Sequence, residues 1–118
     1  MKIESINAPN GDLIVEFTGE MDALGCTEVR PELEKIVQTK NPNVFLDLKE
    51  VSFLDSSGIG AIVFLFKRLN VQQRKLAIVG VQGQPEELMQ LLRIDIAIPV
   101  NKIPVSDLRL KNPLQEAS

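Results

Sequence analysis

The chain has 118 residues, of which 44% are hydrophobic and 25% are charged, with a formal net charge of −3; this length suits one domain, and this apolar content excludes disorder along the whole chain. The acidic balance argues against a general nucleic-acid binder, because binding to phosphate backbones needs a basic surface. No apolar run reaches the roughly 18 residues of a membrane span and residues 1–10 lack the apolar core of a signal peptide, so the sequence predicts a cytoplasmic protein without a membrane partner.

The N-terminal part predicts two strands and a connecting loop. Residues 2–7 suit a short strand, and turn-forming residues separate them from the next apolar run. Over residues 13–18 the apolar Leu13, Val15 and Phe17 alternate with Ile14, Glu16 and Thr18, and this period of two is typical of a half-buried strand. Gly19 is expected to end this strand, and residues 20–26 are expected to form a loop.

A helix and a buried strand are predicted next. Apolar residues at helical spacing form one stripe, which consists of Val29, Leu33, Ile36 and Val37. Because proline is best tolerated in the first turn, the helix is expected to begin at residues 29–31 and to run to about Lys40. Residues 44–48 are a compact apolar run and are interpreted as a buried strand, followed by a loop over residues 49–55.

The C-terminal part alternates between helices and strands. The sequence predicts a very apolar helix over residues 59–70, a strand over 75–81 and a short helix over 84–92. A final strand is expected over 96–100 and a last helix over 105–111. Strands joined through helices imply parallel pairing with right-handed crossovers. The predicted fold class is therefore α/β, with a mixed sheet and helices on one main face.

The chain has no histidine and a single cysteine, Cys26, and this composition excludes several kinds of site. Ser-His-Asp and Cys-His catalytic sites, histidine metal sites, cysteine zinc clusters and an intrachain disulfide are ruled out within this chain. The acidic residues Glu20, Asp22 and Glu28 would raise the pKa of the Cys26 thiol, so this cysteine is interpreted as an ordinary small residue. No metal ion and no cofactor are expected.

The densest chemical signal lies at the start of the apolar helix, where residues 55–60 have the sequence Asp-Ser-Ser-Gly-Ile-Gly. Asp and Ser cap helices because their side-chain oxygens accept hydrogen bonds from unpaired backbone N–H groups. One cap needs only one such residue, yet three stand in a row, and Gly58 and Gly60 each cost a helix about 1 kcal/mol relative to Ala. The pattern indicates either a well-capped helix or a helix start that an anion or a partner surface approaches closely.

The helix that follows carries more apolar surface than one face needs. Its expected core stripe consists of Ile59, Ile62, Val63, Phe66 and Leu69. Ala61, Phe64 and Leu65 widen this surface, and the charged Lys67 and Arg68 come only at the end. The helix is therefore either packed on most sides or partly exposed as a docking surface, which would also allow a weak homodimer.

Two segments resemble a known family. Residues 18–22 (Thr-Gly-Glu-Met-Asp) and 47–60, with Asp-Ser-Ser-Gly-Ile-Gly as the most specific part, resemble the STAS domain of anti-sigma factor antagonists, and the match in order and spacing covers about residues 3–100. The resemblance implies a mixed sheet of four to five strands with helices mainly on one side. This domain is expected over residues 1–112, with 113–118 as a C-terminal tail.

The resemblance also implies a bacterial regulator without enzymatic activity. Such a protein binds an anti-sigma factor, which is a serine kinase, and thereby releases a sigma factor. The kinase phosphorylates the second serine of the block, here Ser57, which switches the antagonist off, and a serine phosphatase reverses the modification. The residues expected to contact the partner are Asp22, Phe53, Leu54, Asp55, Ser56, Ser57, Gly58, Ile59, Gly60 and Phe64.

Elementary electrostatics supports such a switch. A phosphate on Ser57 would lie at the N-terminus of its own helix, where the helix dipole stabilises it by up to about 1 kcal/mol. Asp55 would repel it, and the surrounding apolar rim offers no positive charge. That rim consists of Phe53, Leu54, Ile59 and Phe64. Because burying an unpaired dianion costs several kcal/mol, the modified domain should stay folded and lose its partner.

Other interpretations stay open from the sequence. Ser56 is a rival modification site, although a cap or loop hydrogen bond also explains it, and Asp22 is either a neighbour of the serines across the strand ends or a plain cap. Asp47, within a strand, is interpreted as structural. The resemblance also leaves a second function open, in which the same fold without phosphorylation is a subunit of a lipid-transport, stress-signalling or anion-transport assembly. A further alternative is a nucleotide-binding or hydrolytic module, but the spacing of the glycines does not match that of a P-loop.

Overall fold

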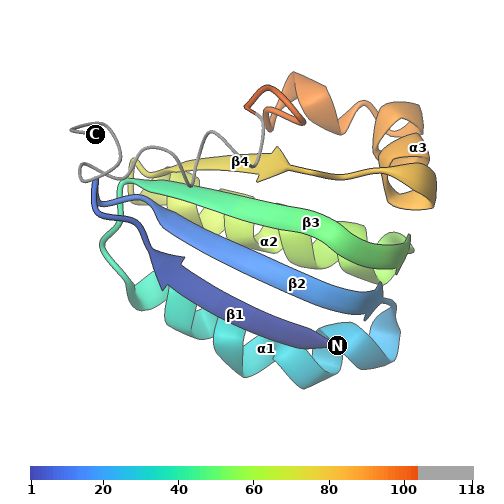
Figure 1. Ribbon diagram of the computed structural model, residues 1–118, viewed down its shortest axis with the longest axis horizontal. Coiled ribbons are helices and arrows are strands. Elements are labelled where there is room, and N and C mark those ends of the chain that lie inside the picture. Colours follow the sequence, from blue (N-terminus) through green and yellow to red (C-terminus); the bar gives the residue numbers. More distant parts are fainter. Residues whose placement is uncertain (104–118) are drawn as a thin grey trace, which may run out of the picture.

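The computed structural model describes residues 1–103 and contains a four-stranded sheet in the order β1-β2-β3-β4. β1 (Lys2–Asn7) pairs antiparallel with β2 (Leu13–Met21), and β2 pairs parallel with β3 (Asn43–Leu54). β3 in turn pairs parallel with β4 (Lys75–Val79). The mixed sheet confirms the predicted α/β class (Figure 1).

Two long helices cover one face of the sheet. α1 (Ala23–Gln38) and α2 (Ser56–Val71) lie side by side behind the strands in Figure 1. α3 (Gly83–Leu91) lies where β3 ends, and a 3-10 turn, η1 (Ile94–Ile96), follows it. The helices therefore lie mainly on one side, as expected. None of the described helices is long and apolar enough to cross a membrane.

The main core lies between the sheet and these two helices. The stripe predicted for the first helix is confirmed, because its members are all buried, namely Val29, Leu33, Ile36 and Val37. In α2, Ile62, Leu65 and Leu69 are buried in this core, at the spacing i, i+3, i+7 of one helix face. For Leu65, one of the residues that widen the apolar surface of this helix, the alternative of packing against the core therefore holds and the alternative of a docking surface does not.

The predicted boundary between the second strand and the first helix is wrong. β2 does not end at Gly19, because this glycine adopts a φ of +118° and accommodates an irregularity in the pairing with β3. The strand continues to Met21, and Asp22 alone joins it to α1, so residues 20–26 form no loop. Pro31 lies inside the helix and not in its first turn. The carbonyl that loses its N–H partner there belongs to an exposed residue four positions earlier, where water can replace the bond.

Two further segments differ from the prediction. The expected loop over residues 49–55 is largely the second half of β3, which stays paired with β2 up to its last residue. The expected strand over residues 96–100 does not form, because η1 and a turn occupy this stretch and Pro99 has no N–H for a ladder. Only Val100 makes a bridge, to β4. The helix expected over 105–111 and the C-terminal tail lie outside the described residues.

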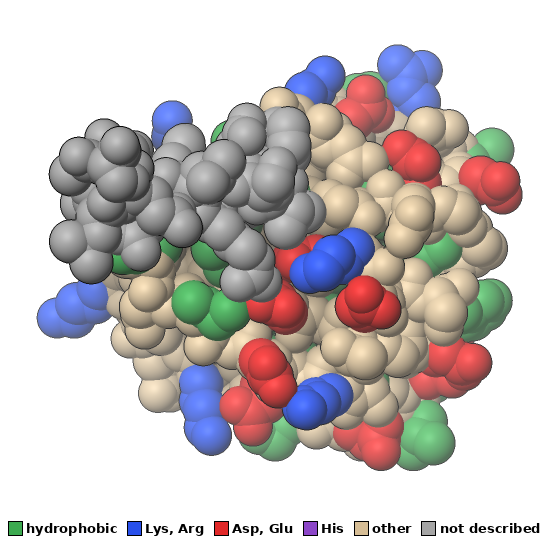
Figure 2. All heavy atoms as spheres, in the orientation of Figure 1, with side chains coloured by type: hydrophobic (Ala, Val, Ile, Leu, Met, Phe, Trp, Pro, Cys, Tyr) green, Lys and Arg blue, Asp and Glu red, His purple; other side chains and the backbone are tan. Residues whose placement is uncertain are grey.

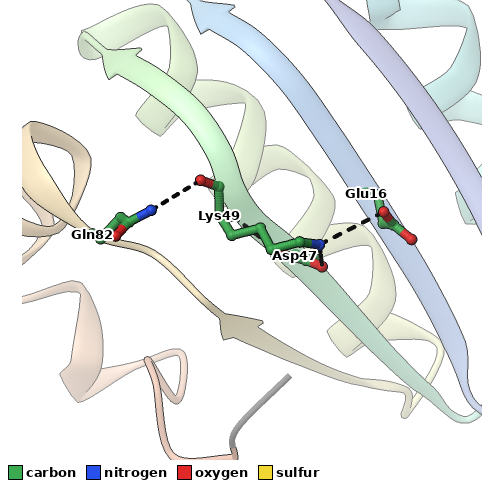
Figure 3. A network of polar contacts seen from close by, with 4 residues as sticks. All are labelled: Glu16, Asp47, Lys49 and Gln82. Carbon is green, nitrogen blue, oxygen red and sulfur yellow. Dashed lines mark hydrogen bonds and ion pairs between the residues drawn. The ribbon is translucent and has the colours of Figure 1, made fainter. Parts of the chain in front are cut away.

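The opposite face of the sheet carries a small apolar cluster and a charge network. The cluster consists of Ile14, Phe45 and Val79. Beside it the Lys49 ammonium lies 2.6 Å from the buried Asp47 carboxylate and 3.7 Å from Glu16, and Gln82 donates to the Lys49 carbonyl (Figure 3). Asp47 is thus part of the scaffold, as interpreted. Figure 2 shows acidic and basic side chains interspersed on this face.

Candidate functional site

The candidate site lies where two parallel strands end and two helices begin, at the right-hand end of Figure 1. Met21 of β2 pairs with Leu54 of β3, and the next residue of each segment is an aspartate. The backbone N–H of Asp55 donates to the carbonyl of Met21 at 3.4 Å. This pairing places Asp22 beside the serine block, as expected from parallel strand ends that meet at one edge.

Both aspartates cap the helix that follows them. Asp22 accepts a hydrogen bond from the backbone N–H of Gly25 at 2.8 Å. Asp55 accepts from the backbone N–H groups of Ser57 at 2.8 Å and Gly58 at 3.3 Å. Each carboxylate therefore lies at the positive end of a helix dipole and satisfies N–H groups that would otherwise lack a partner. The two helix starts repeat one local design, Asp-x-x-Gly.

The glycines of the serine block have different environments. A Cβ on Gly58 would lie 2.3 Å from the Leu54 Cδ1 and 2.5 Å from the Met21 carbonyl oxygen. The close approach at Gly58 is therefore made by the chain's own β2 and β3, and not by an anion or a partner. A Cβ on Gly60 would meet nothing within 4 Å. The missing side chain at Gly60 instead leaves open space at the surface.

Most of the residues predicted to contact a partner are at the surface. Ser56 and Phe53 are exposed, and Ser57 is half-buried. Gly60 is exposed too, and the remaining surface residues of this set are half-buried, namely Asp22, Asp55, Ile59 and Phe64. Leu54 is fully buried on the core side of β3, so the expectation that it belongs to an exposed apolar rim is wrong. Gly58 is buried too, so these two residues support the surface from below and present nothing to a partner.

Ser57 opens onto a groove between α1 and α2 with a volume of about 390 Å³. Both helices line it with residues at the spacing i, i+3, i+4, i+7, which places them on facing sides of two adjacent helices. The α1 side consists of Ala23, Cys26, Thr27 and Arg30, and the α2 side of Ser57, Gly60, Ala61 and Phe64, with Leu33 completing the lining. The small side chains on both helices leave the groove open.

Sequence reasoning missed the α1 side of this groove. The sequence predicts a loop over residues 20–26 and a helix that begins at residues 29–31, because Pro31 is expected in the first turn, so the pattern indicates no helical face over residues 23–27. The signal that could have found it is the shared spacing, because residues 23, 26, 27 and 30 repeat the pattern of residues 57, 60, 61 and 64. The expectation that the surroundings of Ser57 offer no positive charge is also corrected, since Arg30 lines the same groove.

Cys26 shows how charge is distributed in the groove. Burial raises the pKa of its thiol above the ordinary value, and the carboxylates of Asp55 and Asp22 raise the pKa further. The guanidinium of Arg30 acts in the opposite direction and lowers the pKa. The Cys26 thiol therefore lies within the fields of both capping aspartates and of Arg30. Among residues 1–103 no group of three or more His, Cys, Asp or Glu side chains is placed to hold a metal ion.

Replacing Asp22 with Asn is expected to speed the alkylation of Cys26. The thiolate is the nucleophile, so a lower thiol pKa increases the reactive fraction at neutral pH. Asn still caps a helix, and the loss of one nearby negative charge should raise the rate with iodoacetamide about threefold. Asp95→Asn is the control, because the Asp95 carboxylate is not among the charges that act on Cys26. Equal rates in both variants would contradict the charge distribution described above.

Comparison with known proteins identifies the family. A family model described as the STAS domain matches residues 5–107. The anti-sigma F factor antagonist of Paenibacillus polymyxa is 29% identical over 91 residues, which cover 76% of this chain and 78% of that protein. The anti-sigma-B factor antagonist of Staphylococcus aureus is 28% identical over 88 residues, which cover 75% of this chain and 82% of that protein.

Solved structures share the fold. A crystal structure of an anti-sigma factor antagonist from Mycobacterium paratuberculosis has a TM-score of 0.77 at 19% identity and covers 91% of both chains. The anti-sigma factor antagonist SpoIIAA in its unphosphorylated form has a TM-score of 0.68 at 13% identity, over 90% of this chain and 93% of that chain. Because the family model spans most of the chain and the sheet and helices match these structures, the chain belongs to the STAS domain family.

Proposed function

We propose that this protein is a cytoplasmic anti-sigma factor antagonist that acts by binding and not by catalysis. The surface around Ser57 binds an anti-sigma factor that is also a serine kinase. That kinase transfers the terminal phosphoryl group of ATP to the Ser57 Oγ, which loses its proton while ADP leaves, and the binding then ends. A serine phosphatase restores the unmodified form. The two relatives described above are both named as antagonists of anti-sigma factors, and each matches about three quarters of this chain.

The position of Ser57 carries this proposal. Its side chain is half-buried in the first turn of α2 and lines an open groove, so it is not sealed beneath other side chains. Phe53 is 40% exposed and Ser56 is exposed, so an apolar ring and a second hydroxyl flank the site. This arrangement combines an apolar contact with a hydroxyl that a kinase can reach.

The fold tolerates a charge at this place. A phosphate in the first turn of a helix lies near the positive end of the helix dipole, which interacts favourably with its negative charge. SpoIIAA has been solved in a phosphorylated form as well, with a TM-score of 0.68 to this chain. These points support a switch in which phosphorylation alters the contact surface and leaves the scaffold folded.

Phosphorylation by a candidate kinase tests the proposal. The purified protein is incubated with ATP and serine kinases of the anti-sigma type from the same organism, and the intact mass is measured. We expect a mass gain of one phosphate in the wild type and in Ser56→Ala, and no gain in Ser57→Ala. A gain that disappears in Ser56→Ala would move the modification to the rival serine. No gain with any such kinase would favour an unmodified subunit of a larger assembly.

A further inference from the structure

We propose that Arg30 is the intramolecular partner of the phosphate on Ser57, so that the modified side chain lies in the groove between α1 and α2. This inference rests on the proposed phosphorylation of Ser57 and names how the modified state is held. Ser57 and Arg30 line the same groove from opposite helices.

The spacing of the groove brings the two side chains towards each other. Because Met21 pairs with Leu54 and each helix begins two residues later, α1 and α2 start at about the same level. Arg30 comes seven residues after Ala23, about 10 Å further along the axis of α1. Side chains of a helix lean towards its N-terminus, so the long side chain of Arg30 leans towards the level of Ser57. Cys26 lies between the two levels, and its thiol is within the field of the Arg30 guanidinium.

The Arg30 guanidinium is available for a new partner. Within residues 1–103 it forms neither an ion pair nor a hydrogen bond, and its side chain is exposed. The groove residues between it and Ser57 are small, with Cys26 and Thr27 on one helix and Gly60 and Ala61 on the other. A phosphate can therefore enter the groove without breaking an existing pair and without displacing a large side chain.

Charge gives the phosphate a reason to enter the groove. The Asp55 carboxylate occupies the cap of α2 and repels a phosphate from that side. Arginine offers a planar fork of N–H donors that binds phosphate in a bidentate manner, which a lysine does not reproduce. In the unmodified protein the groove stays open, and in the modified protein the paired phosphate occupies part of it. The contact surface thus changes in shape as well as in charge.

Titration of the phosphate by phosphorus NMR tests the pairing. Phosphoserine is incorporated at position 57 during translation, so no kinase is needed. The second pKa of a phosphoserine is ordinarily about 6, and a nearby cation lowers it. We expect the pKa of this phosphate to rise by about half a unit in Arg30→Gln, which is roughly a threefold change in the acid constant. Arg30→Lys should lie between Arg30→Gln and the wild type.

Arg68→Gln is the matched control. Arg68 is also exposed, and its guanidinium lies over the ring of Phe64, 5.5 Å from the ring centroid. Arg68 lies in the last turn of α2 and does not line the groove, so its removal takes away the same charge without removing a residue of the lining. An equal shift in both arginine variants, or no shift in either, would overturn the pairing. Because the phosphate is incorporated without a kinase, this experiment tests the pairing with Arg30 separately from the phosphorylation of Ser57 by a kinase.

Discussion

Replacing Ser57 with Asp is expected to weaken binding to the anti-sigma factor by more than about a hundredfold. The new carboxylate joins Asp22 and Asp55, whose charges already act in this groove, against the single cation Arg30. An uncompensated charge that is buried in a protein contact costs about 3 kcal/mol or more, and every 1.4 kcal/mol is tenfold in the dissociation constant. Titration calorimetry with the purified partner measures this loss.

The same variant should remain folded. A carboxylate in the first turn of α2 interacts favourably with the helix dipole, by about 0.3–1 kcal/mol, so the free energy of unfolding in urea should not fall. Ser56→Asp is the matched control, because Ser56 is exposed and its neighbouring charge stays hydrated. We expect Ser56→Asp to weaken binding by less than about tenfold. A Ser57→Asp protein that binds the anti-sigma factor as tightly as the wild type would contradict the proposed switch.

The parts of the fold that follow a simple period were predictable from the sequence. Residues 13–18 follow a period of two in β2, with Leu13, Val15 and Phe17 buried in the main core. Ile14, on the other face, is buried as well, in the small cluster on the opposite side of the sheet. The helical stripe that ends at Val37 is buried as predicted. In these segments the local pattern and the burial in the core require the same conformation, so no tertiary information was needed.

The errors arose where tertiary contacts override a local rule. Gly19 normally ends a strand and Pro31 normally ends a helix. In β2, however, Gly19 lies at an irregularity in the pairing with β3, and Pro31 lies on a solvent-exposed face of α1, so both elements continue. Ile94, Ile96 and Ile98 alternate like a strand, but only Ile98 is buried. At the site, the serine block was found because its residues are adjacent in sequence. Arg30 was missed because only the packing of α1 against α2 brings it to the groove.

Replacing Gly58 with Ala is expected to destabilise the domain by about 2–3 kcal/mol. The added methyl would lie 2.3 Å from the Leu54 Cδ1, 2.5 Å from the Met21 carbonyl oxygen and 2.8 Å from the Met21 Cβ. The leucine methyl can rotate away, but the carbonyl belongs to the backbone of β2, so α2 itself has to move. This movement outweighs the roughly 1 kcal/mol that alanine adds to helix propensity. Urea unfolding measures the change in free energy.

Gly60→Ala separates the crowding at Gly58 from a general effect of alanine in this helix. Both glycines lie in the first two turns of α2, but a Cβ on Gly60 meets nothing within 4 Å. Gly60→Ala should therefore stabilise the domain by about 0.5–1 kcal/mol, so that the two variants differ by about 3 kcal/mol. Equal stabilities would mean that α2 does not rest on β2 at Gly58. The packing that positions Ser57 at the end of the groove would then have another origin.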